Sequence, residues 1–252
     1  MPSFAFFDLD HTLLPFDTQA LFANHMLQQD RGRTAYLIRF APIALLRAAK
    51  VLPTVTAKRA FMGYMKGLSS AVLTEQARAF AQQVVRPWAY PELMAEVARH
   101  RAAGRTLILN TASPDVYAHE IAKALGFDHC IATQVQPSER MPALPVVLGS
   151  NNKREAKIVA MKKAVPAVAA ATPEELQDSW AYSDSAADLP LLELAGHGVL
   201  VHPNEALEAI GKSRGWQVLH PKRPYQNKAG DVLCSALQAF GLYNTPPPRV
   251  QA

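Results

Sequence analysis

Two acidic residues follow a short apolar run near the start of the chain. Asp8-Leu9-Asp10 comes directly after the apolar residues Phe4 to Phe7. Such a run is typical of a buried strand in a parallel sheet, and ligands of these sheets bind beyond the carboxyl ends of the strands. If the chain stays extended, Asp8 and Asp10 point to the same side, where they suit a metal-binding nucleophile and a general acid/base. The alternative is a pair of acids that cap a turn.

A hydroxyl follows a second apolar run. Thr111 comes directly after the run from Thr106 to Asn110, and Ala112 comes next. A hydroxyl and free backbone N–H groups just before a helix would bind an anion such as a phosphate. The alternative is a plain helix cap formed by Ser113 or Asp115.

A second acidic pair and a lysine complete the set. Asp184 follows the run from Trp180 to Ser183, and Asp188 comes four positions later. Carboxylate oxygens are ligands that Mg²⁺ prefers, although an N-cap at Asp184 and a solvent-facing Asp188 would also explain the pattern. Lys157 borders the apolar residues of a predicted helix from Lys153 to Lys163. It is a candidate partner for an anion, and the alternative is a solvated surface lysine.

The elements that must position these side chains alternate between strands and helices. Such alternation predicts an α/β fold in which helices cover both faces of a parallel sheet. Residues 15–88 interrupt the alternation with helical patterns and no strand. We therefore expect a core formed by residues 1–14 and 89–252 and an inserted all-α cap domain at 15–88. Strands are predicted at 4–7, 106–110, 127–134, 180–183, 198–201 and 216–219, and core helices at 91–103, 115–125, 153–163, 189–195 and 205–212, with one more that starts at Thr172.

The order of these motifs resembles that of the haloacid dehalogenase superfamily of phosphohydrolases. Asp8-Leu9-Asp10-His11-Thr12 is similar to the first motif of the superfamily, Thr111 to the second, Lys157 to the third, and Asp184 with Asp188 to the fourth. The resemblance covers residue 3 to about residue 220. It implies a Rossmann-like three-layer core, and the helical insert resembles the type-1 cap of the phosphoserine-phosphatase-like branch, subfamily IB.

The resemblance also implies how a phosphoryl group would be transferred. Asp8 would attack phosphorus and form an aspartyl phosphate. Asp10 would protonate the leaving oxygen and then activate water. Thr111, Ala112 and Lys157 would bind the phosphoryl oxygens, and positive charge placed there in advance would compensate the charge of the transferred group.

A Mg²⁺ ion is implied as the cofactor. The resemblance gives Asp8, Asp184 and the backbone carbonyl of Asp10 as its ligands, and Asp188 as a residue that orders the metal shell or Lys157. The expected activity is therefore that of a Mg²⁺-dependent phosphomonoester phosphatase. A phosphotransferase would use the same aspartyl phosphate, so the motifs leave these two open.

Two features differ from the pattern of phosphoserine phosphatases. Ala112-Ser113-Pro114 stands where that pattern has two glycines, and Asp17 stands where it has a glutamate that binds the substrate amine. The residues around Asp184 are more similar to a bacterial sister group of mixed substrates. That group includes phosphatidylglycerophosphate phosphatases, which have a basic, apolar cap. A small soluble phosphate and a membrane lipid phosphate are both candidate substrates.

The positive charge of the chain is concentrated in the predicted cap. The 252 residues carry a formal net charge of +5, and residues 31–74 contain eight cations and no Asp or Glu. Arg39, Arg47 and Lys50 fall near one another on a helical wheel, with apolar residues around them. Such a surface would bind anionic lipid, so the expected partners are a small phosphorylated substrate and an anionic membrane surface contacted by 31–66. No nucleic acid is expected, because aromatic and basic residues do not alternate.

Composition limits the class of protein. Hydrophobic residues make up 49% and charged residues 19%, which indicates a globular chain rather than a disordered or fibrous one. Two cysteines and an N-terminus without a signal-peptide pattern predict a cytoplasmic protein, peripheral to the inner face of the membrane if the cap binds lipid. The competing class is a non-catalytic basic module for membrane or nucleic acid. It predicts a decayed site, whereas all four motifs are intact.

Overall fold

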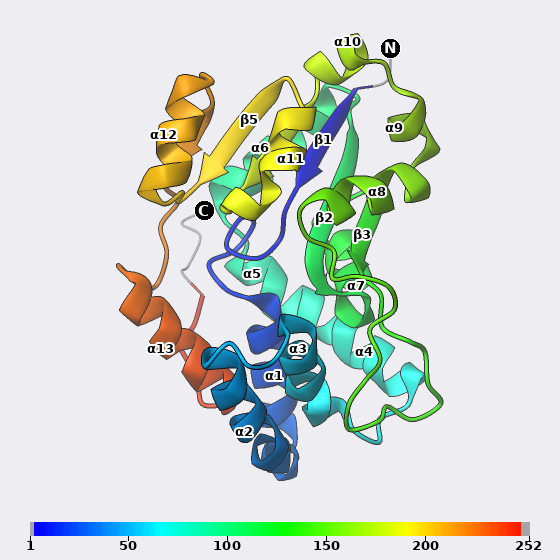
Figure 1. The fold of residues 1–252 in the computed structure, drawn as a ribbon, viewed down its shortest axis with the longest axis vertical. Coiled ribbons are helices and arrows are strands. Elements are labelled where there is room, and N and C mark those ends of the chain that lie inside the picture. Colours follow the sequence, from blue (N-terminus) through cyan, green and yellow to red (C-terminus); the bar gives the residue numbers. More distant parts are fainter. Residues whose placement is uncertain (1–2, 248–252) are drawn as a thin grey trace.

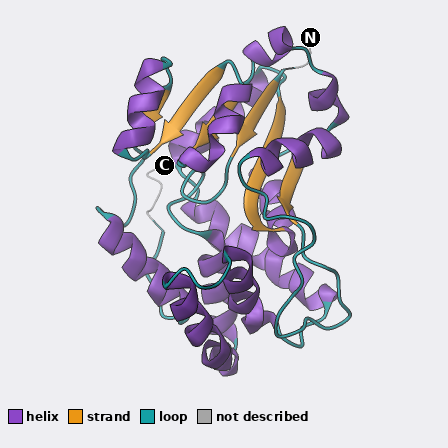
Figure 2. Cartoon of the chain, in the orientation of Figure 1, coloured by secondary structure: helices purple, strands orange, loops and turns teal. Residues whose placement is uncertain are grey.

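The protein contains a parallel sheet with helices on both faces. A computed structural model describes residues 3–247, and its six strands have the order β3-β2-β1-β4-β5-β6. Neighbouring strands are parallel throughout, so their carboxyl ends lie along one edge of the sheet (Figures 1 and 2). The predicted α/β fold with a Rossmann-like core is therefore confirmed. The strands are β1 (Phe4–Phe7), β2 (Thr106–Pro114), β3 (His129–Thr133), β4 (Trp180–Ser183), β5 (His197–Val201) and β6 (Gln217–Leu219).

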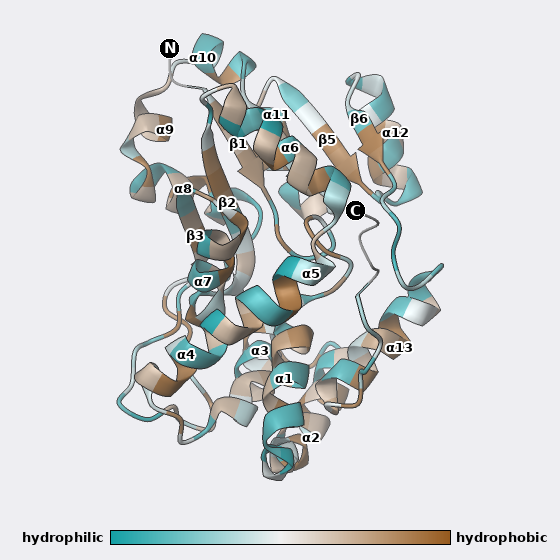
Figure 3. Ribbon diagram, turned by 180° about the vertical axis from the view of Figure 1, so that it is seen from behind, coloured by the Kyte–Doolittle hydropathy of each residue, from teal (hydrophilic) through white to brown (hydrophobic). Residues whose placement is uncertain are grey.

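Strand β1 explains why the sheet has a helix layer on each side. Phe4 and Phe6 pack into one buried apolar cluster, while Ala5 and Phe7 pack into another. Successive side chains of a strand point to opposite faces, so a run without a polar position is covered on both sides. Strand β1 is accordingly hydrophobic along its length (Figure 3). The helices of the core are α6 (Pro91–Ala102), α7 (Asp115–Leu125), α8 (Glu155–Ala164), α9 (Pro166–Ala170), α10 (Pro173–Gln177), α11 (Leu189–Leu194) and α12 (Glu205–Ser213).

A helical region lies between β1 and α6, beside the carboxyl ends of the strands (Figure 1). Its interior joins that of the core, because the ring of Phe22 packs against Phe80 at 5.0 Å and against Tyr117 of α7 at 4.9 Å. The helical region is therefore packed against the core beside the carboxyl ends of the strands. Its elements are α1 (Thr18–Gln29), η1 (Arg31–Tyr36), α2 (Leu37–Ala48), α3 (Thr54–Phe61), η2 (Met62–Met65), α4 (Ser70–Phe80), η3 (Ala81–Val85) and α5 (Arg86–Trp88).

A helix that the sequence patterns did not predict lies near the end of the chain. This helix, α13 (Lys228–Ala239), runs beside α1 rather than on the sheet (Figure 1). Arg31 donates a hydrogen bond to the carbonyl of Gly241 at 2.6 Å, and Asn24 exchanges two with the backbone of Tyr243 at 3.1 Å each. The division into a core of 1–14 and 89–252 and a cap of 15–88 stays a prediction, and its residues 1–2 and 248–252 lie outside the described part.

Three local features differ from the sequence predictions. Strand β2 extends to Pro114, because its irregular pairing with β3 continues to that residue. Helix α8 starts at Glu155, two residues later than predicted, after Arg154 with a φ of 57°. Helix α2 ends at Ala48, and Lys50 lies beyond it with a φ of 59°, so the helical wheel does not apply to Lys50. The predicted helix start at Thr172 is confirmed as a capping box.

Candidate active site

The carboxylate of Asp8 lies at the end of β1 against a buried lysine. Its backbone N–H donates to the carbonyl of Tyr182 at 3.0 Å, which continues the pairing of β1 with β4. Lys157 Nζ donates to Asp8 Oδ1 at 2.8 Å and to Asp188 Oδ2 at 2.7 Å. The lysine is 1% exposed, so its charge is compensated by these two carboxylates alone rather than by water. Three residues predicted from separate motifs are therefore in direct contact.

The lysine reaches this position because of how α8 begins. Arg154 precedes the helix with a left-handed φ of 57°, and Lys157 is the third helical residue. Its carbonyl accepts a hydrogen bond from Asn110 Nδ2 at 3.2 Å. The first turn of α8 is therefore attached to β2, and the lysine side chain points across the strand ends. The alternative of a solvated surface lysine is wrong.

Asp10 is held by two hydroxyl residues. Thr18 donates to Asp10 Oδ1 from its backbone N–H at 2.7 Å and from its hydroxyl at 2.6 Å. Ser113 Oγ donates to Asp10 Oδ2 at 2.7 Å. The chain reverses between the two acids and Thr18, with His11 at a φ of 57°. Three donated hydrogen bonds fix both oxygens of Asp10, which a general acid/base needs for a defined orientation.

Sequence reasoning missed the roles of Thr18 and Ser113. The sequence suggests Ser113 only as a helix cap, but Pro114 is the N-cap of α7 and no side chain caps that helix. Asp115, the other candidate cap, instead accepts a hydrogen bond from the N–H of Val135 at 3.0 Å. Thr18 is the first residue of α1, and its only sequence signal is its position after Asp17 at a helix start.

Thr111 and Ala112 lie at the carboxyl end of β2. The Thr111 side chain is buried, and its oxygen accepts from the N–H of Ser113 at 3.0 Å, which leaves its own hydroxyl proton for another acceptor. The carbonyl of Ala112 accepts from Lys58 Nζ of α3 at 2.6 Å. Asn152, also missed from the sequence, donates to the carbonyl of Thr111 at 2.8 Å. Both residues are thus fixed between the strand, α3 and the loop before α8.

Asp184 follows β4 and contacts the first motif. Thr12 Oγ1 accepts a hydrogen bond from the N–H of Asp184 at 3.1 Å, and its hydroxyl lies 3.4 Å from Asp184 Oδ1. Burial raises the pKa of Asp184 to about 6. Asp188 has a different position, because Ser183 Oγ and Lys157 Nζ both donate to its Oδ2, at 2.9 and 2.7 Å. It therefore contacts the lysine, which was one of its two expected roles.

The strand ends carry more negative than positive charge. Burial raises the pKa of Asp8 well above its usual range, and Asp188, Asp184 and Asp10 raise it further, although Lys157 opposes them. Burial by itself would lower the pKa of Lys157, but its two carboxylate partners raise it. The site thus has one buried lysine and four acids: Asp8, Asp10, Asp184 and Asp188. A bound cation would relieve the repulsion among the carboxylates.

The donors present fit Mg²⁺. Carboxylate oxygens of Asp8 and Asp184 with the backbone carbonyl of Asp10 would give an all-oxygen set, which hard divalent cations prefer. Within residues 3–247 no group of three or more His, Cys, Asp or Glu side chains forms a metal site. The expected set has only two such side chains as direct ligands, so it does not depend on a group of that size.

A cavity of about 550 Å³ opens from Asp10 between the helical region and the core. Asp17 and Lys58 line it from the helical region and Ser113 from β2. Burial lowers the pKa of Lys58 to about 8, and burial followed by the charge of Asp10 raises the pKa of Asp17. A substrate held at the strand ends would extend into this space.

Comparison with known proteins agrees with this geometry. A family model described as haloacid dehalogenase-like hydrolase matches residues 5–193. A Mycobacterium tuberculosis protein named as a probable phosphatase is 27% identical over 223 residues, which cover 87% of this chain and 76% of that protein. A histidinol-phosphatase of Neisseria meningitidis is 25% identical over 239 residues, covering 88% and 100%. The crystal structure of a Bordetella pertussis protein of unknown function has a TM-score of 0.74 and 30% identity, covering 87% and 99%.

The chain belongs to the haloacid dehalogenase-like hydrolase family. The predicted resemblance is confirmed, and the chain is an enzyme of the phosphatase kind. Phosphatases of this family generally use Mg²⁺ and act on phosphorylated substrates. Within the described residues, no helix has the length and apolar character needed to cross a membrane.

Proposed function

We propose that the enzyme is a Mg²⁺-dependent phosphomonoester phosphatase that transfers the phosphoryl group to Asp8 before water releases it. The observation that carries this proposal is the buried contact of Lys157 with Asp8 and Asp188 at the carboxyl edge of the sheet. A lysine in this position aligns one carboxylate oxygen and supplies positive charge beside it. A nucleophile for an anionic phosphate ester needs such compensation.

In the first step an oxygen of Asp8 attacks phosphorus, and the bond from phosphorus to the ester oxygen breaks. Asp10 donates a proton to the departing oxygen, so the leaving group departs as an alcohol. In the second step Asp10 takes a proton from water as that water attacks the phosphorus of the aspartyl phosphate. Inorganic phosphate leaves, and Asp8 is regenerated. The hydrogen bonds from Thr18 and Ser113 keep Asp10 oriented for both proton transfers.

The phosphoryl oxygens bind to groups on the neighbouring strand ends. The hydroxyl of Thr111, the backbone at Ala112 and the ammonium of Lys157 provide hydrogen-bond donors or positive charge. Asp8, Asp184 and the carbonyl of Asp10 would hold Mg²⁺, with Asp188 acting on Lys157 or the metal shell. When bound, the ion supplies charge stabilisation to the transferred group. The part of Asp188 in the metal site stays a prediction.

The helical region at 15–88 acts in this proposal as the cap of a core formed by 1–14 and 89–252. It covers the strand ends and bounds the cavity that receives the leaving group. A cavity of about 550 Å³ suits a small organic phosphate. Membership of a hydrolase family favours an enzyme over the non-catalytic binding module.

A second candidate places the substrate in a membrane, as a lipid phosphate such as phosphatidylglycerophosphate. It is favoured by helix α2, in which no residue is buried. Ile38 is 80% and Leu45 72% exposed, and Val51 beyond the helix is 65% exposed. Arg39 lies among these apolar residues. An exposed helix of mixed basic and apolar character is typical of proteins that lie on anionic membranes.

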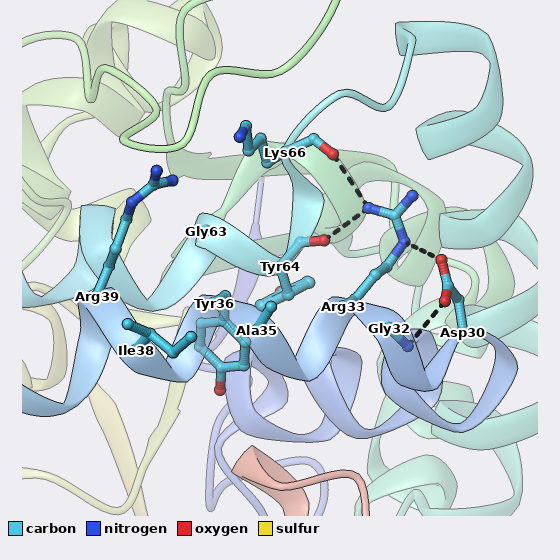
Figure 4. Close-up of a pocket in the computed structure, with 10 residues that line it drawn as sticks. All are labelled: Asp30, Gly32, Arg33, Ala35, Tyr36, Ile38, Arg39, Gly63, Tyr64 and Lys66. Carbon is cyan, nitrogen blue, oxygen red and sulfur yellow. Dashed lines mark hydrogen bonds and ion pairs between the residues drawn. The ribbon is translucent and has the colours of Figure 1, made fainter.

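A nearby pocket adds to this basic surface. It has a volume of about 480 Å³ and is lined by η1, η2 and the start of α2 (Figure 4). Arg33 is used within the fold, since it donates to the carbonyls of Tyr64 and Lys66 and pairs with Asp30. In the described part of the chain, no ion pair involves the side chain of Arg39 or Lys66. These two charges remain for an anion at the cap surface.

The proposal is tested by trapping the aspartyl phosphate. Enzyme mixed with a labelled phosphate ester and Mg²⁺ is quenched in acid, and the label is located by mass spectrometry of the peptide that contains Asp8. We expect phosphorylation of Asp8 in the wild type and none in Asp8→Asn. Turnover with the label on another residue, or on none, would remove Asp8 from the role of nucleophile.

A further inference from the structure

Two histidines lie together at the β6 side of the sheet, and neither lines the cavity that opens from Asp10. His202 directly follows β5, and His220 directly follows the edge strand β6. The pairing of these strands brings Val201 opposite Leu219, so the two strands end at the same level (Figure 3). It continues one step further, because the N–H of His202 donates to the carbonyl of Leu219 at 3.0 Å. The fold therefore places the two histidine side chains next to each other.

The two imidazole rings approach each other through one nitrogen each. The Nδ1 atoms of His202 and His220 are 3.4 Å apart, and the ring centroids are 5.3 Å apart. Two nitrogen atoms that bind one zinc ion at about 2.0–2.1 Å with tetrahedral angles are themselves about 3.3–3.4 Å apart. The observed separation is long for a hydrogen bond, but it matches that of two ligands on one ion.

A backbone carbonyl determines which nitrogen of His202 is free. The Nε2 atom lies 2.7 Å from the carbonyl oxygen of Pro221, which can only accept, so Nε2 carries the proton. In the neutral ring the lone pair is therefore on Nδ1, the atom that faces His220. Histidines that bind metals usually donate their other N–H in this way, which fixes both the ring and its tautomer. His202 also has a left-handed φ of 47°, a conformation that non-glycine residues seldom adopt and that here directs the ring.

The protonation and exposure of the pair suit a metal site. Burial lowers the pKa of His202; the carbonyl of Pro221 opposes this shift, whereas the charges of Arg223 and His220 add to it. The ring is therefore neutral at neutral pH, as a metal ligand must be. His220 is exposed, so an ion can reach the pair from solvent. Within residues 3–247 no third His, Cys, Asp or Glu joins them in a metal-binding group, so water would complete the coordination.

From this geometry we propose that His202 and His220 together bind one divalent metal ion that prefers nitrogen ligands, such as Zn²⁺, through their Nδ1 atoms. Two imidazoles favour such an ion over Mg²⁺, which prefers oxygen ligands. The ion joins the end of β5 to the end of β6 and so holds the edge strand on the sheet. This site shares no ligand with the proposed magnesium site and does not depend on the proposed phosphatase function.

The test is a calorimetric titration of Zn²⁺ into tag-free protein with Mg²⁺ in excess. Wild type should show a zinc site that is weakened at least about 10-fold in His220→Ala and in His202→Asn, because loss of even an outer partner of a metal ligand costs that much. Asparagine is chosen at 202 because it tolerates a positive φ. His197→Ala is the matched control, since His197 is an exposed histidine at the amino end of β5, and its zinc affinity should equal that of wild type.

Two further measurements identify the ligands and the effect of the ion. X-ray absorption at the zinc edge should show two imidazole ligands in wild type. Zn²⁺ should also raise the thermal midpoint of wild type but of neither His202→Asn nor His220→Ala, because an ion that binds only the folded state stabilises it. The spectrum of wild type reports the ligands directly, so it decides the case in which a variant fails to fold.

The outcomes separate this site from the active site. If wild type binds no Zn²⁺, the two histidines form only a hydrogen bond and the proposal is overturned. Zinc that binds both histidine variants as tightly as wild type, or that is held by oxygen ligands and lost in Asp184→Ala, would lie in the active site and would also overturn it. An equal loss of affinity in His197→Ala would show that the pair has no special role. Hydrolytic activity enters none of these readings, so the proposed phosphatase function stands or fails separately.

Discussion

Replacing Lys157 by methionine should destabilise the protein as well as inactivate it. Lys157→Met keeps the length of the side chain and removes its charge. The Asp8 and Asp188 carboxylates, now 2.8 and 2.7 Å from Nζ, would lose their shared cation. Breaking a buried ion pair from one side costs about 3–5 kcal/mol of unfolding free energy. At two to four degrees per kcal/mol, the thermal midpoint should fall by roughly 6–20 °C.

The loss should depend on pH with a defined sign. Burial already raises the pKa of Asp8 well above its usual range, and without Lys157 it would rise further. A carboxyl group with a raised pKa in the folded state favours folding at low pH, and this contribution is lost as pH rises through that pKa. The difference in stability between wild type and Lys157→Met should therefore be larger at about pH 8 than at about pH 5.

The assay is denaturant unfolding in the presence of chelator, so that no divalent cation replaces the lysine charge. A double variant, Lys157→Met with Asp188→Asn, supplies the control. It removes one carboxylate together with the cation, and the amide can still accept from Ser183, so part of the lost stability should return. If Lys157→Met at neutral pH is within about 0.5 kcal/mol of wild type, the ion pair does not have the assigned role.

Three further predictions concern activity and binding. Asp8→Asn should abolish turnover and leave the fold intact, because the near-isosteric amide is a poor nucleophile; activity measured in protein free of deamidation checks this. Chelation should stop hydrolysis, and Mg²⁺ should restore it better than Ca²⁺, because Ca²⁺ favours longer bonds to its ligands. Asp184→Ala should raise the Mg²⁺ concentration that is needed for activity. Full activity in excess chelator would contradict the mechanism. The protein should bind anionic but not zwitterionic vesicles, and the binding should weaken as salt rises. The triple variant Arg39→Gln, Arg47→Gln and Lys50→Gln should no longer bind anionic vesicles. Failure of wild type to bind them at low salt would exclude the lipid candidate.

The residues at the strand ends could be predicted because their signal is local. An apolar run that ends in an acid fixes both the strand and the place of the acid, as at Phe7 and Asp8. The same reasoning located Asp184, and the order of the motifs located Lys157. Local reasoning could not supply the backbone turn at Arg154 that starts α8. Outside glycine a positive φ is enriched at Asn, Asp and His, and an arginine gives no sign of it. For this reason the predicted helix start, Lys153, lies two residues before the observed one, Glu155.

Contacts between residues that are far apart in the chain could not be predicted from local sequence patterns. Ser113 and Asp10 are far apart in the chain, and their hydrogen bond exists only because β2 lies beside β1. Helix α13 has a weak signal of its own, because Gly230 and Ser235 are poor helix formers, and it depends on packing against α1. Packing of this kind is decided by the partner surface, which a single segment does not reveal.

The residues expected to act on the phosphoryl group are local features of the sequence, whereas the residues that line the cavity for the leaving group come together only through long-range contacts. The groups that would handle the phosphoryl group come from neighbouring strand ends, so one stretch of a few residues fixes each of them. The walls of the cavity come from segments as distant as Phe40 and Asp231, which meet only in the folded chain. Substitutions at strand ends should therefore change the rate for every substrate, whereas substitutions on α13 should change the ranking of substrates. The family match ends at residue 193 and identifies the reaction class, whereas α13, which also lines the cavity, lies beyond the matched residues.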